Sequence, residues 1–251
     1  PRLEVSHLHI PATLGPVEDV SFSVSAGECV GLVGLRGSGS ATVADAVVGL
    51  VKPASGEIKV DGKPILAGRV DATLRQGVTY VPEDRHARGF VPYLGVGENL
   101  VLSILKRVSS WGIVSRSSHE RVATGMVEQL GIVTSGLDQQ VGQLSGGNQQ
   151  KVVVGRALAG HPKVLVAVTP TVGVDVAAKE SLLNVIGAAR DGGAAVLLIS
   201  DDLEDLRICT RLLVMVQGKV VKEYREPPWD RHELIAAVEG LEPASTKGEA
   251  L

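Results

Sequence analysis

The sequence predicts an α/β protein, built on a mostly parallel core sheet with an antiparallel β layer and a helical insert. From about residue 163 to 216, apolar segments of strand length alternate with helix-periodic segments, which is typical of a parallel sheet covered by helices. A second observation is a short apolar strand at 29–33 that runs into a glycine-rich loop and then into a helix. Third, apolar residues recur every three or four positions between about 90 and 150, which indicates helices.

The first third of the chain is predicted to be mainly β-structure. A turn from Pro11 to Pro16 separates two segments in which apolar and polar residues alternate. Further along, Asp61-Gly62 predicts a hairpin turn. The predicted elements in this part are strands at 2–9, 17–24 and 29–33, a helix at 41–50, and strands at 57–60 and 78–81.

The rest of the chain is predicted to be helical at first and then to alternate between strands and helices. Apolar positions with helical spacing in the insert are Leu100, Ile104, Val122, Met126, Val127 and Leu130. The elements after the insert are a strand at 163–168, a helix at 176–190, a strand at 195–200, a helix at 202–209, and strands at 212–216 and 219–223. We therefore expect a single domain at 1–242, with its helical part inserted at about 90–160, and a flexible tail at 243–251.

Composition and charge exclude several classes of protein. The net charge of −3 and the scattered lysines and arginines argue against a protein that binds nucleic acid. No apolar run approaches the roughly 18–20 residues that span a bilayer, and no signal segment leads the chain. We therefore expect a cytoplasmic protein. The chain begins at Pro1, inside a strand-like pattern and without an initiator methionine, so we expect it to be part of a longer polypeptide.

Cysteine and histidine residues indicate no metal or redox site. Cys29 and Cys209 lie in apolar segments, and we expect them to be small buried residues in a reducing compartment. The six histidines have no metal-ligand spacing and no accompanying set of cysteines or acids. The sequence therefore predicts no metal site, and it contains no arrangement typical of a Ser-His-Asp or Cys-His nucleophile.

A phosphate site is indicated by the run Leu144-Ser145-Gly146-Gly147-Asn148-Gln149. Two adjacent glycines leave the backbone bare, so that successive N–H groups can converge on an anion. The helix that follows directs the positive end of its dipole to the same point. We therefore predict that Ser145 and the amides of Gly146 and Gly147 bind phosphate.

A second phosphate loop is indicated at residues 34–42, although its polar positions are altered. The segment has the spacing G-x-x-x-x-G-K-[ST] between a strand and a helix, as a P-loop does. Ser40 occupies the lysine position and Ala41 the position of the hydroxyl that binds Mg²⁺. Thr42 comes one residue late, which turns its side chain by about 100° on a helix. Alone, the segment also fits an ordinary strand-to-helix turn, but the run at 144–149 favours the phosphate interpretation. The predicted loop residues are Gly34, Gly37, Ser38, Gly39, Ser40, Ala41 and Thr42.

The order of these segments resembles that of ATP-binding-cassette (ABC) ATPases. The resemblance extends over about residues 2–240. It is strongest to the second, C-terminal cassette of the tandem ATPases that energise simple-sugar importers of the ribose, galactose and xylose type. It implies a P-loop NTPase-like ABC cassette, that is, one nucleotide-binding domain. The segments that carry it are Pro82-Glu83-Asp84-Arg85, Leu144 to Lys151, Gly173-Val174-Asp175-Val176 and a closing helix from Trp229 to Gly240.

The resemblance also implies roles for individual residues. Glu83 would lie in the Q-loop, between the sheet and the helical insert, and Asp175 in the D-loop, which crosses to the other cassette. Val168 and Thr169 stand where the family carries an Asp for Mg²⁺ and a Glu for water, so no catalytic residue would be intact. Asp201 stands at the switch position, where many relatives have His; we expect it instead to cap the helix that follows.

The altered positions all fall on one site, and they predict weak or absent ATP binding and little hydrolysis by this domain alone. No aromatic residue lies between Pro11 and Asp19 to stack on adenine. The sequence leaves open whether Arg36 reaches the phosphates in place of the lysine. In the family, two cassettes pair head to tail, so the signature run of this chain would complete the ATP site of a partner cassette.

The resemblance thus implies the nucleotide-binding domain of a bacterial sugar importer, which works with ATP and Mg²⁺ in the assembled transporter. Its partners would be a second nucleotide-binding domain in the N-terminal half of the same polypeptide, membrane permease subunits and, indirectly, a substrate-binding protein, but no nucleic acid. It would lie at the inner face of the cell membrane, with a hydrophobic groove beside Glu83 for a helix of the membrane subunit. Alone, it would be a monomer or a weak dimer. Two alternatives stay open: the ATPase domain of a nucleoside importer, and an ABC regulator or scaffold outside transport.

Overall fold

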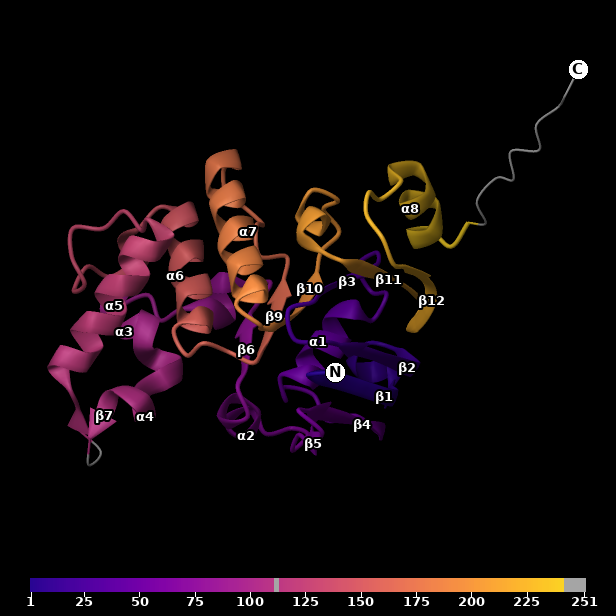
Figure 1. Ribbon diagram of the computed structural model, residues 1–251, viewed down its shortest axis with the longest axis horizontal. Coiled ribbons are helices and arrows are strands. Elements are labelled where there is room, and N and C mark those ends of the chain that lie inside the picture. Colours follow the sequence, from indigo (N-terminus) through magenta and orange to yellow (C-terminus); the bar gives the residue numbers. More distant parts are fainter. Residues whose placement is uncertain (111–112, 242–251) are drawn as a thin grey trace, which may run out of the picture.

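The core of the fold is a six-stranded, mostly parallel sheet, as predicted (Figure 1). The computed structural model describes residues 1–110 and 113–241. The strands of the core sheet are β3 (Cys29–Val33), β6 (Val78–Val81), β9 (Val164–Val168), β10 (Ala195–Ile199), β11 (Arg211–Val216) and β12 (Lys219–Tyr224). They are ordered β12-β11-β3-β10-β9-β6, and only β12, on the edge, is antiparallel to its neighbour. Every residue of β3, β9 and β10 is buried, which explains why these strands are continuous apolar runs.

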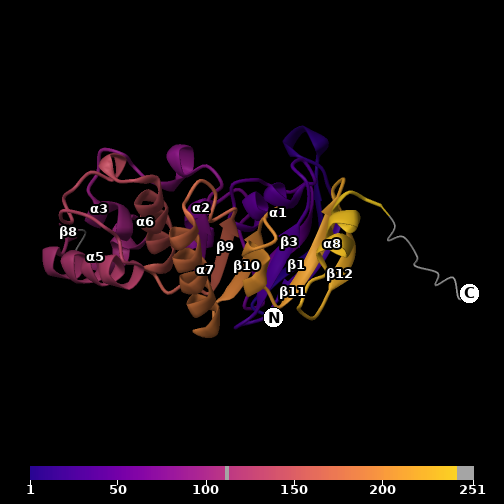
Figure 2. The same ribbon diagram turned by 90° about the horizontal axis from the view of Figure 1, so that it is seen from above.

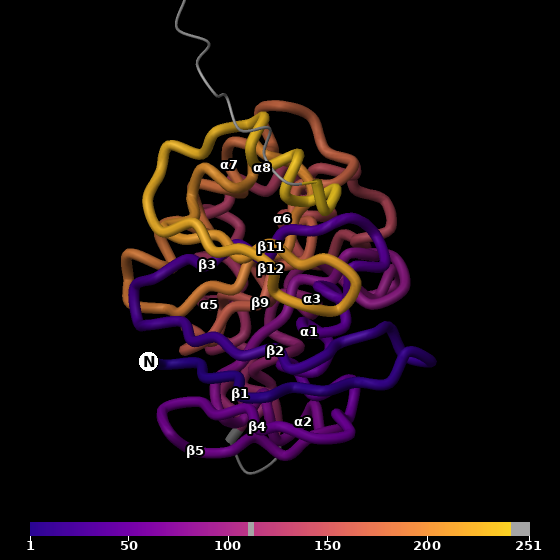
Figure 3. Tube along the Cα trace, turned by 90° about the vertical axis from the view of Figure 1, so that its right-hand side faces the viewer, coloured from indigo at the N-terminus to yellow at the C-terminus, as the bar shows by residue number. Residues whose placement is uncertain are grey.

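A second, antiparallel sheet forms its own layer. Its strands are β1 (Leu3–Ile10), β2 (Val17–Val24), β4 (Ser55–Val60) and β5 (Lys63–Pro64), in the order β2-β1-β4-β5. Figure 3 shows β1, β2 and β4 as a layer below β3, β11 and β12. The predicted hairpin turn is confirmed, because Asp61 and Gly62 have φ values of 47° and 72° between two paired strands. The turn before β2 contains the short 3-10 helix η1 (Ala12–Leu14).

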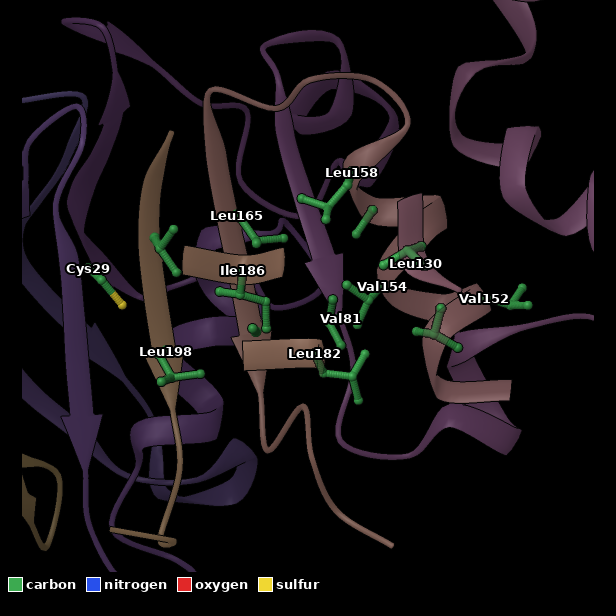
Figure 4. Close-up of a cluster of buried hydrophobic side chains, with 14 of the residues drawn as sticks. Cys29, Val81, Leu130, Val152, Val154, Leu158, Leu165, Leu182, Ile186 and Leu198 are labelled. Carbon is green, nitrogen blue, oxygen red and sulfur yellow. The ribbon is translucent and has the colours of Figure 1, made fainter. Parts of the chain in front are cut away.

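Helices cover both faces of the core sheet. α1 (Ser40–Val47) shares a buried cluster with the antiparallel sheet, whereas α6 (Gly146–Leu158) and α7 (Val176–Asp191) share another with the opposite face. Successive residues of β9 alternate between these clusters, because side chains of a strand point to opposite faces. Figure 4 shows Leu165 of β9 and Leu198 of β10 directed at Leu182 and Ile186 of α7.

The predicted helical insert forms one end of the molecule (Figure 2). A buried amide fixes the loop by which the chain enters it: Asn99 donates to the carbonyls of Val91, Leu94 and Gly95 and accepts from the Val91 N–H. Among the elements that were not predicted from the sequence are α2 (Val70–Arg75), before the insert, and the short strands β7 (Ser109–Ser110) and β8 (Ile113–Val114) within it. The other elements between β6 and α6 are η2 (Arg85–Gly89), α3 (Val96–Val101), η3 (Leu102–Ile104), α4 (Leu105–Val108), α5 (Arg116–Leu130) and η4 (Val141–Gln143).

Two predictions for the segment after β10 are wrong. Instead of a helix at 202–209, the chain forms only the 3-10 helix η5 (Asp205–Ile208). Asp201 does not cap it, because the residue before η5 is Glu204, and no side chain caps this helix. The turn that leads into η5 is held by Asp202, whose carboxylate accepts from the Glu204 N–H at 2.9 Å.

A buried carboxylate explains this departure from helical structure. The side chain of Asp205 is only 1% exposed, and it accepts hydrogen bonds from the hydroxyls of Thr171, at 2.8 Å, and Ser200, at 2.9 Å. The ammonium of Lys179 lies 3.6 Å away. Burial raises the pKa of Asp205 above its ordinary value. These tertiary contacts hold the segment against the loops that follow β9 and β10.

The C-terminal part of the described chain ends in α8 (Arg231–Val238), which lies within the expected closing helix. The flexible tail that we expected at 243–251 lies outside the described residues. Within residues 1–110 and 113–241, no helix combines the length and the apolar character needed to cross a membrane.

The two cysteines are buried, as expected. Cys29, at the start of β3, and Cys209, after η5, have free thiols whose sulfur atoms lie 3.6 Å apart. The hydrogen bond with Cys29 and burial both raise the pKa of the Cys209 thiol. Both thiols therefore belong to the core between β3 and the segment that precedes β11.

The core between β9, β10 and α7 gives a stability prediction. Ile186 is fully buried, so we expect Ile186→Ala to lower the free energy of unfolding by about 2–5 kcal/mol, measured by urea denaturation. Val176 begins the same helix and is 85% exposed, so Val176→Ala is the matched control and should stay within about 0.5 kcal/mol. Equal effects of the two substitutions would contradict this packing.

The pKa of Asp205 gives a second prediction. Because its folded-state pKa is raised above 3.8, protonation favours the folded state, and this contribution is lost as the pH rises through the raised pKa. The variant Asp205→Asn does not titrate at this position. We therefore expect the wild type to gain stability relative to Asp205→Asn as the pH falls from about 7 to 4, in urea unfolding at a series of pH values. A difference that is constant or changes in the opposite sense would refute the assignment.

Candidate functional site

A glycine loop connects β3 to α1 at the carboxyl edge of the core sheet. Gly37 and Gly39 have φ values of 85° and 96°, a conformation that favours glycine. At Gly34, a Cβ would lie 2.4 Å from the hydroxyl oxygen of Ser38, so the close turn excludes a larger residue there. The loop is also tied to the turn between β11 and β12, because the Gly218 N–H donates to the Ser38 carbonyl at 2.8 Å. The segment predicted from the P-loop spacing is therefore a tight strand–loop–helix turn.

This loop forms one wall of a cleft of about 370 Å³. The ends of β9 and β10 form other walls, since the carboxyl ends of neighbouring parallel strands meet at one edge of a sheet. The cleft brings together residues that the sequence predicted for the nucleotide site. Those that line it are Gly34, Gly37, Gly39, Ser40, Ala41, Thr42, Glu83, Val168, Thr169 and Asp201.

The hydroxyl groups of the loop are already engaged within the protein. Ser40 is 7% exposed, and its hydroxyl accepts from that of Ser38 at 3.2 Å. The hydroxyl of Thr42 donates to the carbonyl of Leu14 at 3.4 Å. Ser40, which the P-loop spacing predicts to stand at the lysine position, is thus a small, nearly buried side chain that carries no charge.

The end of β9 presents no carboxylate to the cleft. Val168 is 3% exposed and belongs to the core. Thr169 has φ of 41°, which is unfavourable for a β-branched residue, and its N–H donates to the Ile199 carbonyl at 2.7 Å. Its buried hydroxyl oxygen finds no hydrogen-bond partner among the described residues.

The charged side chains of the cleft are one cation and two acids. Arg36 lies at the rim with its side chain 86% exposed, and its guanidinium donates to the Glu83 carboxylate at 3.1 Å. Asp201 is exposed and also lines the cleft, so acidic groups outnumber basic ones there by one. Arg36, which the sequence offers as a replacement for the phosphate lysine, thus pairs with Glu83 in this structure.

The signature run, defined here as residues 144–149, lies away from this cleft, and none of its members lines it. Leu144 is buried and anchors the run, whereas Ser145 is exposed at the N-terminus of α6. Asn148 donates its side-chain amide to the Ser145 hydroxyl at 3.0 Å, and Gln149 donates to the Leu144 carbonyl at 3.1 Å. The first N–H groups of α6 have no acceptor within a helix, so this end can bind an anion.

The predicted D-loop packs directly against the signature run. Asp175 caps α7 by accepting from the Ala178 N–H at 2.9 Å. Its other carboxylate oxygen lies 3.6 Å from the point where a Cβ on Gly147 would stand. Arg85 joins the two segments by donating to the Val172 carbonyl at 3.0 Å. The sequence marks Arg85 only as part of the segment Pro82-Glu83-Asp84-Arg85, and its contact with the D-loop segment becomes visible only in the structure.

Comparison with known proteins agrees with this geometry. Two curated relatives are the ribose import ATP-binding protein RbsA 1 of Mesorhizobium japonicum and the ribose import ATP-binding protein RbsA of Chelativorans sp.. The first is 40% identical over 94% of this chain and 46% of its own length, and the second 39% identical over 93% and 47%. The chain thus spans about half the length of the curated relatives it matches.

Solved structures support the same fold. A dimeric ATP-binding cassette in a post-hydrolysis state, bound to ADP and Pi, matches with a TM-score of 0.78 and 22% identity over 90% of this chain and 100% of that one. A nucleotide-free cassette matches with a TM-score of 0.77 and 23% identity, over 95% of this chain and 94% of that one. The family described as ABC transporter matches residues 17–172. The chain is therefore an ATP-binding domain of the ABC transporter family.

Proposed function

We propose that this chain is a nucleotide-binding domain of an importer for simple sugars, and that it supplies its signature run to the ATP site of a partner cassette. The relatives are named as ribose import ATP-binding proteins, which supports sugar import. They are about twice as long as this chain, which supports a partner cassette in the same polypeptide. The observation that carries the proposal is the contrast between an altered cleft and an intact signature run in one chain.

The cleft of this chain does not fit a triphosphate with its Mg²⁺. Among the described residues, no lysine lines it, the hydroxyls of Ser40 and Thr42 are bonded within the protein, and β9 ends without a carboxylate. Two acids face one cation, so a polyanion would be repelled. Each missing unit-charge contact at about 4 Å removes on the order of 4 kcal/mol of attraction at an effective dielectric of 20, before desolvation is subtracted. We therefore propose that ATP binds weakly, if at all, in this cleft, and we assign no chemical step to it.

The signature run retains what an anion site requires. Ser145 is exposed, and the amides of Gly146 and Gly147 lie at the positive end of a 13-residue helix. In a head-to-tail pair, the hydroxyl and these amides would face the terminal phosphate of ATP that the partner holds with Mg²⁺. Fixed amide donors stabilise the charge that develops when this phosphate is transferred to water. The chain would thus complete an active site whose metal and general base belong to the partner.

A membrane partner is supported by an apolar groove of about 230 Å³ between the core sheet and the helical insert. Its walls include Val70 and Leu74 of α2, which are 46% and 36% exposed, and Leu102 of η3. Tyr80 also lines it, in the strand that leads to Glu83. We propose that a helix of a permease subunit occupies this groove and holds the chain at the inner face of the membrane.

The partner role is tested in the assembled transporter. We expect Ser145→Arg, which fills the anion site, to lower steady-state ATP hydrolysis roughly 10²-fold or more. The control is Ser40→Ala in the loop of the chain's own cleft, which should leave hydrolysis within about twofold because no phosphate is bound there. Loss of hydrolysis with Ser40→Ala but not with Ser145→Arg would reverse the assignment. Brisk Mg²⁺-dependent turnover by the isolated chain would also contradict it.

The groove gives a separate prediction. We expect Leu74→Glu to reduce the fraction of the chain that co-purifies with its permease about tenfold, because a carboxylate would be buried at an apolar contact. Val221→Glu is the matched control, since Val221 is 54% exposed on β12, away from the groove. If both substitutions weaken co-purification equally, the groove is not the docking site.

A further inference from the structure

Arg85 lies between the two segments of this chain that would face a partner cassette. Its guanidinium nitrogen Nη2 stands 3.1 Å from the point where a Cβ on Gly146 would be, at the start of α6. Its Nη1 stands 3.4 Å from the corresponding point at Gly173 and donates to the Val172 carbonyl at 3.0 Å. The guanidinium therefore occupies the space left by two glycines, one in the signature run and one in the D-loop.

The backbone of Arg85 is held in place by its neighbours. The Asp84 carboxylate accepts from the N–H groups of His86 and Ala87, at 2.9 and 3.0 Å, and closes the turn at the start of η2. These hydrogen bonds favour the ionised carboxylate and lower the pKa of Asp84. The Arg85 carbonyl accepts from the Phe90 N–H at 3.2 Å. The position of the Arg85 Cα, from which the side chain extends, is thus fixed by backbone hydrogen bonds.

Most of the N–H donors of Arg85 are not engaged by described residues of the protein. A guanidinium offers five N–H donors, and the Val172 carbonyl is the one acceptor found for them among the described residues. Its Nε is buried and has no partner in the described part of the chain. By contrast, Arg36 pairs with Glu83 and Arg88 pairs with Asp45. Within residues 1–110 and 113–241, no carboxylate forms an ion pair with Arg85.

The guanidinium of Arg85 lies next to the N-terminus of α6, which is itself positive because of the helix dipole. A guanidinium next to it adds repulsion unless an anion lies between them. A phosphate would compensate the positive charge of the helix N-terminus and of the guanidinium together, since its oxygens accept from helix amides and from a guanidinium at the same time. The arrangement is therefore suited to a terminal phosphate that approaches the signature run.

We infer that Arg85 contacts a terminal phosphate oxygen of the ATP bound by the partner cassette, beside Ser145 and the amides of Gly146 and Gly147. This inference rests on the proposed function. The chain that lacks the phosphate lysine in its own cleft then contributes a cation to the other site. Arg85 would thus be a catalytic residue in trans, because it contacts the terminal phosphate, which ATP has and ADP lacks.

The test uses the assembled transporter with three substitutions at this position. We expect Arg85→Gln to lower kcat/KM for ATP roughly 10²-fold, because a charge-assisted contact to the transferring group is lost. Arg85→Lys keeps the charge and should recover part of the activity. Arg85→Ala leaves space for a free guanidinium ion, and millimolar guanidinium should raise its hydrolysis about tenfold. The control is Arg88→Gln, three residues along η2, which should stay within about twofold.

Measurements of nucleotide affinity and of thermal unfolding distinguish phosphate binding by Arg85 from a purely structural role of this residue. We expect Arg85→Gln to weaken binding of ATP to the assembly roughly tenfold or more and to leave ADP binding and the melting temperature unchanged. Equal loss of ATP and ADP affinity, or a lowered melting temperature without rescue by lysine or guanidinium, would overturn the inference. Should Arg85→Gln fail to fold, Arg85→Lys and guanidinium rescue of Arg85→Ala decide the matter.

Comparison of ATP hydrolysis by Ser145→Arg and by Arg85→Gln distinguishes a failure of the inference about Arg85 from a failure of the proposed function. If Ser145→Arg abolishes hydrolysis and Arg85→Gln does not, the inference about Arg85 fails and the proposed function stands. If Ser145→Arg leaves hydrolysis intact, the proposed function fails, and the inference fails with it.

Discussion

The site depends on the parallel pairing of β3, β10 and β9. These strands are buried on both faces, and their hydrogen bonds fix where each one ends. Because the strands run in one direction, the loops after them meet at one edge of the sheet. The glycine loop, Thr169 and Asp201 therefore share a cleft although they are far apart in sequence. A shift of one residue in this register would exchange the side chains that face one buried cluster with those that face the other, and it would displace the strand ends that line the cleft.

Three carboxylates, each held by hydrogen bonds, then order the loops around that edge. Asp205 ties Thr171, after β9, to Ser200, after β10. Asp84 closes the turn that carries Arg85, and Asp175 caps α7 beside the signature run. In each case a carboxylate accepts from hydroxyl or backbone donors that would otherwise be unsatisfied. The loops are thus positioned by polar contacts, whereas the apolar core positions the strands.

The distribution of charge differs between the cleft and the signature run. In the cleft, the single cation Arg36 is neutralised by Glu83, and Asp201 adds a negative charge. At the signature run, the helix amides and Arg85 add positive potential, and no ion pair of Arg85 offsets it in the part of the chain that is described. The asymmetry supports a domain that acts on a phosphate held elsewhere. The relatives are about twice as long as this chain, which is consistent with the proposal that a partner cassette belongs to the same polypeptide.

Sequence alone determined the fold class, the family and most elements, because apolar periodicity and glycine spacing are local signals. It placed Gly34 correctly at the end of a strand and Ser145 at the start of a helix, since each of these depends on neighbours in the chain. It failed where distant residues compete with local preference. The helix expected at 202–209 is replaced by η5 because the buried Asp205 bonds to Thr171 and Ser200. The pairing of Arg36 with Glu83, and the position of Arg85 between Gly146 and Gly173, arise only when strands and loops far apart in the chain are brought to one edge of the sheet.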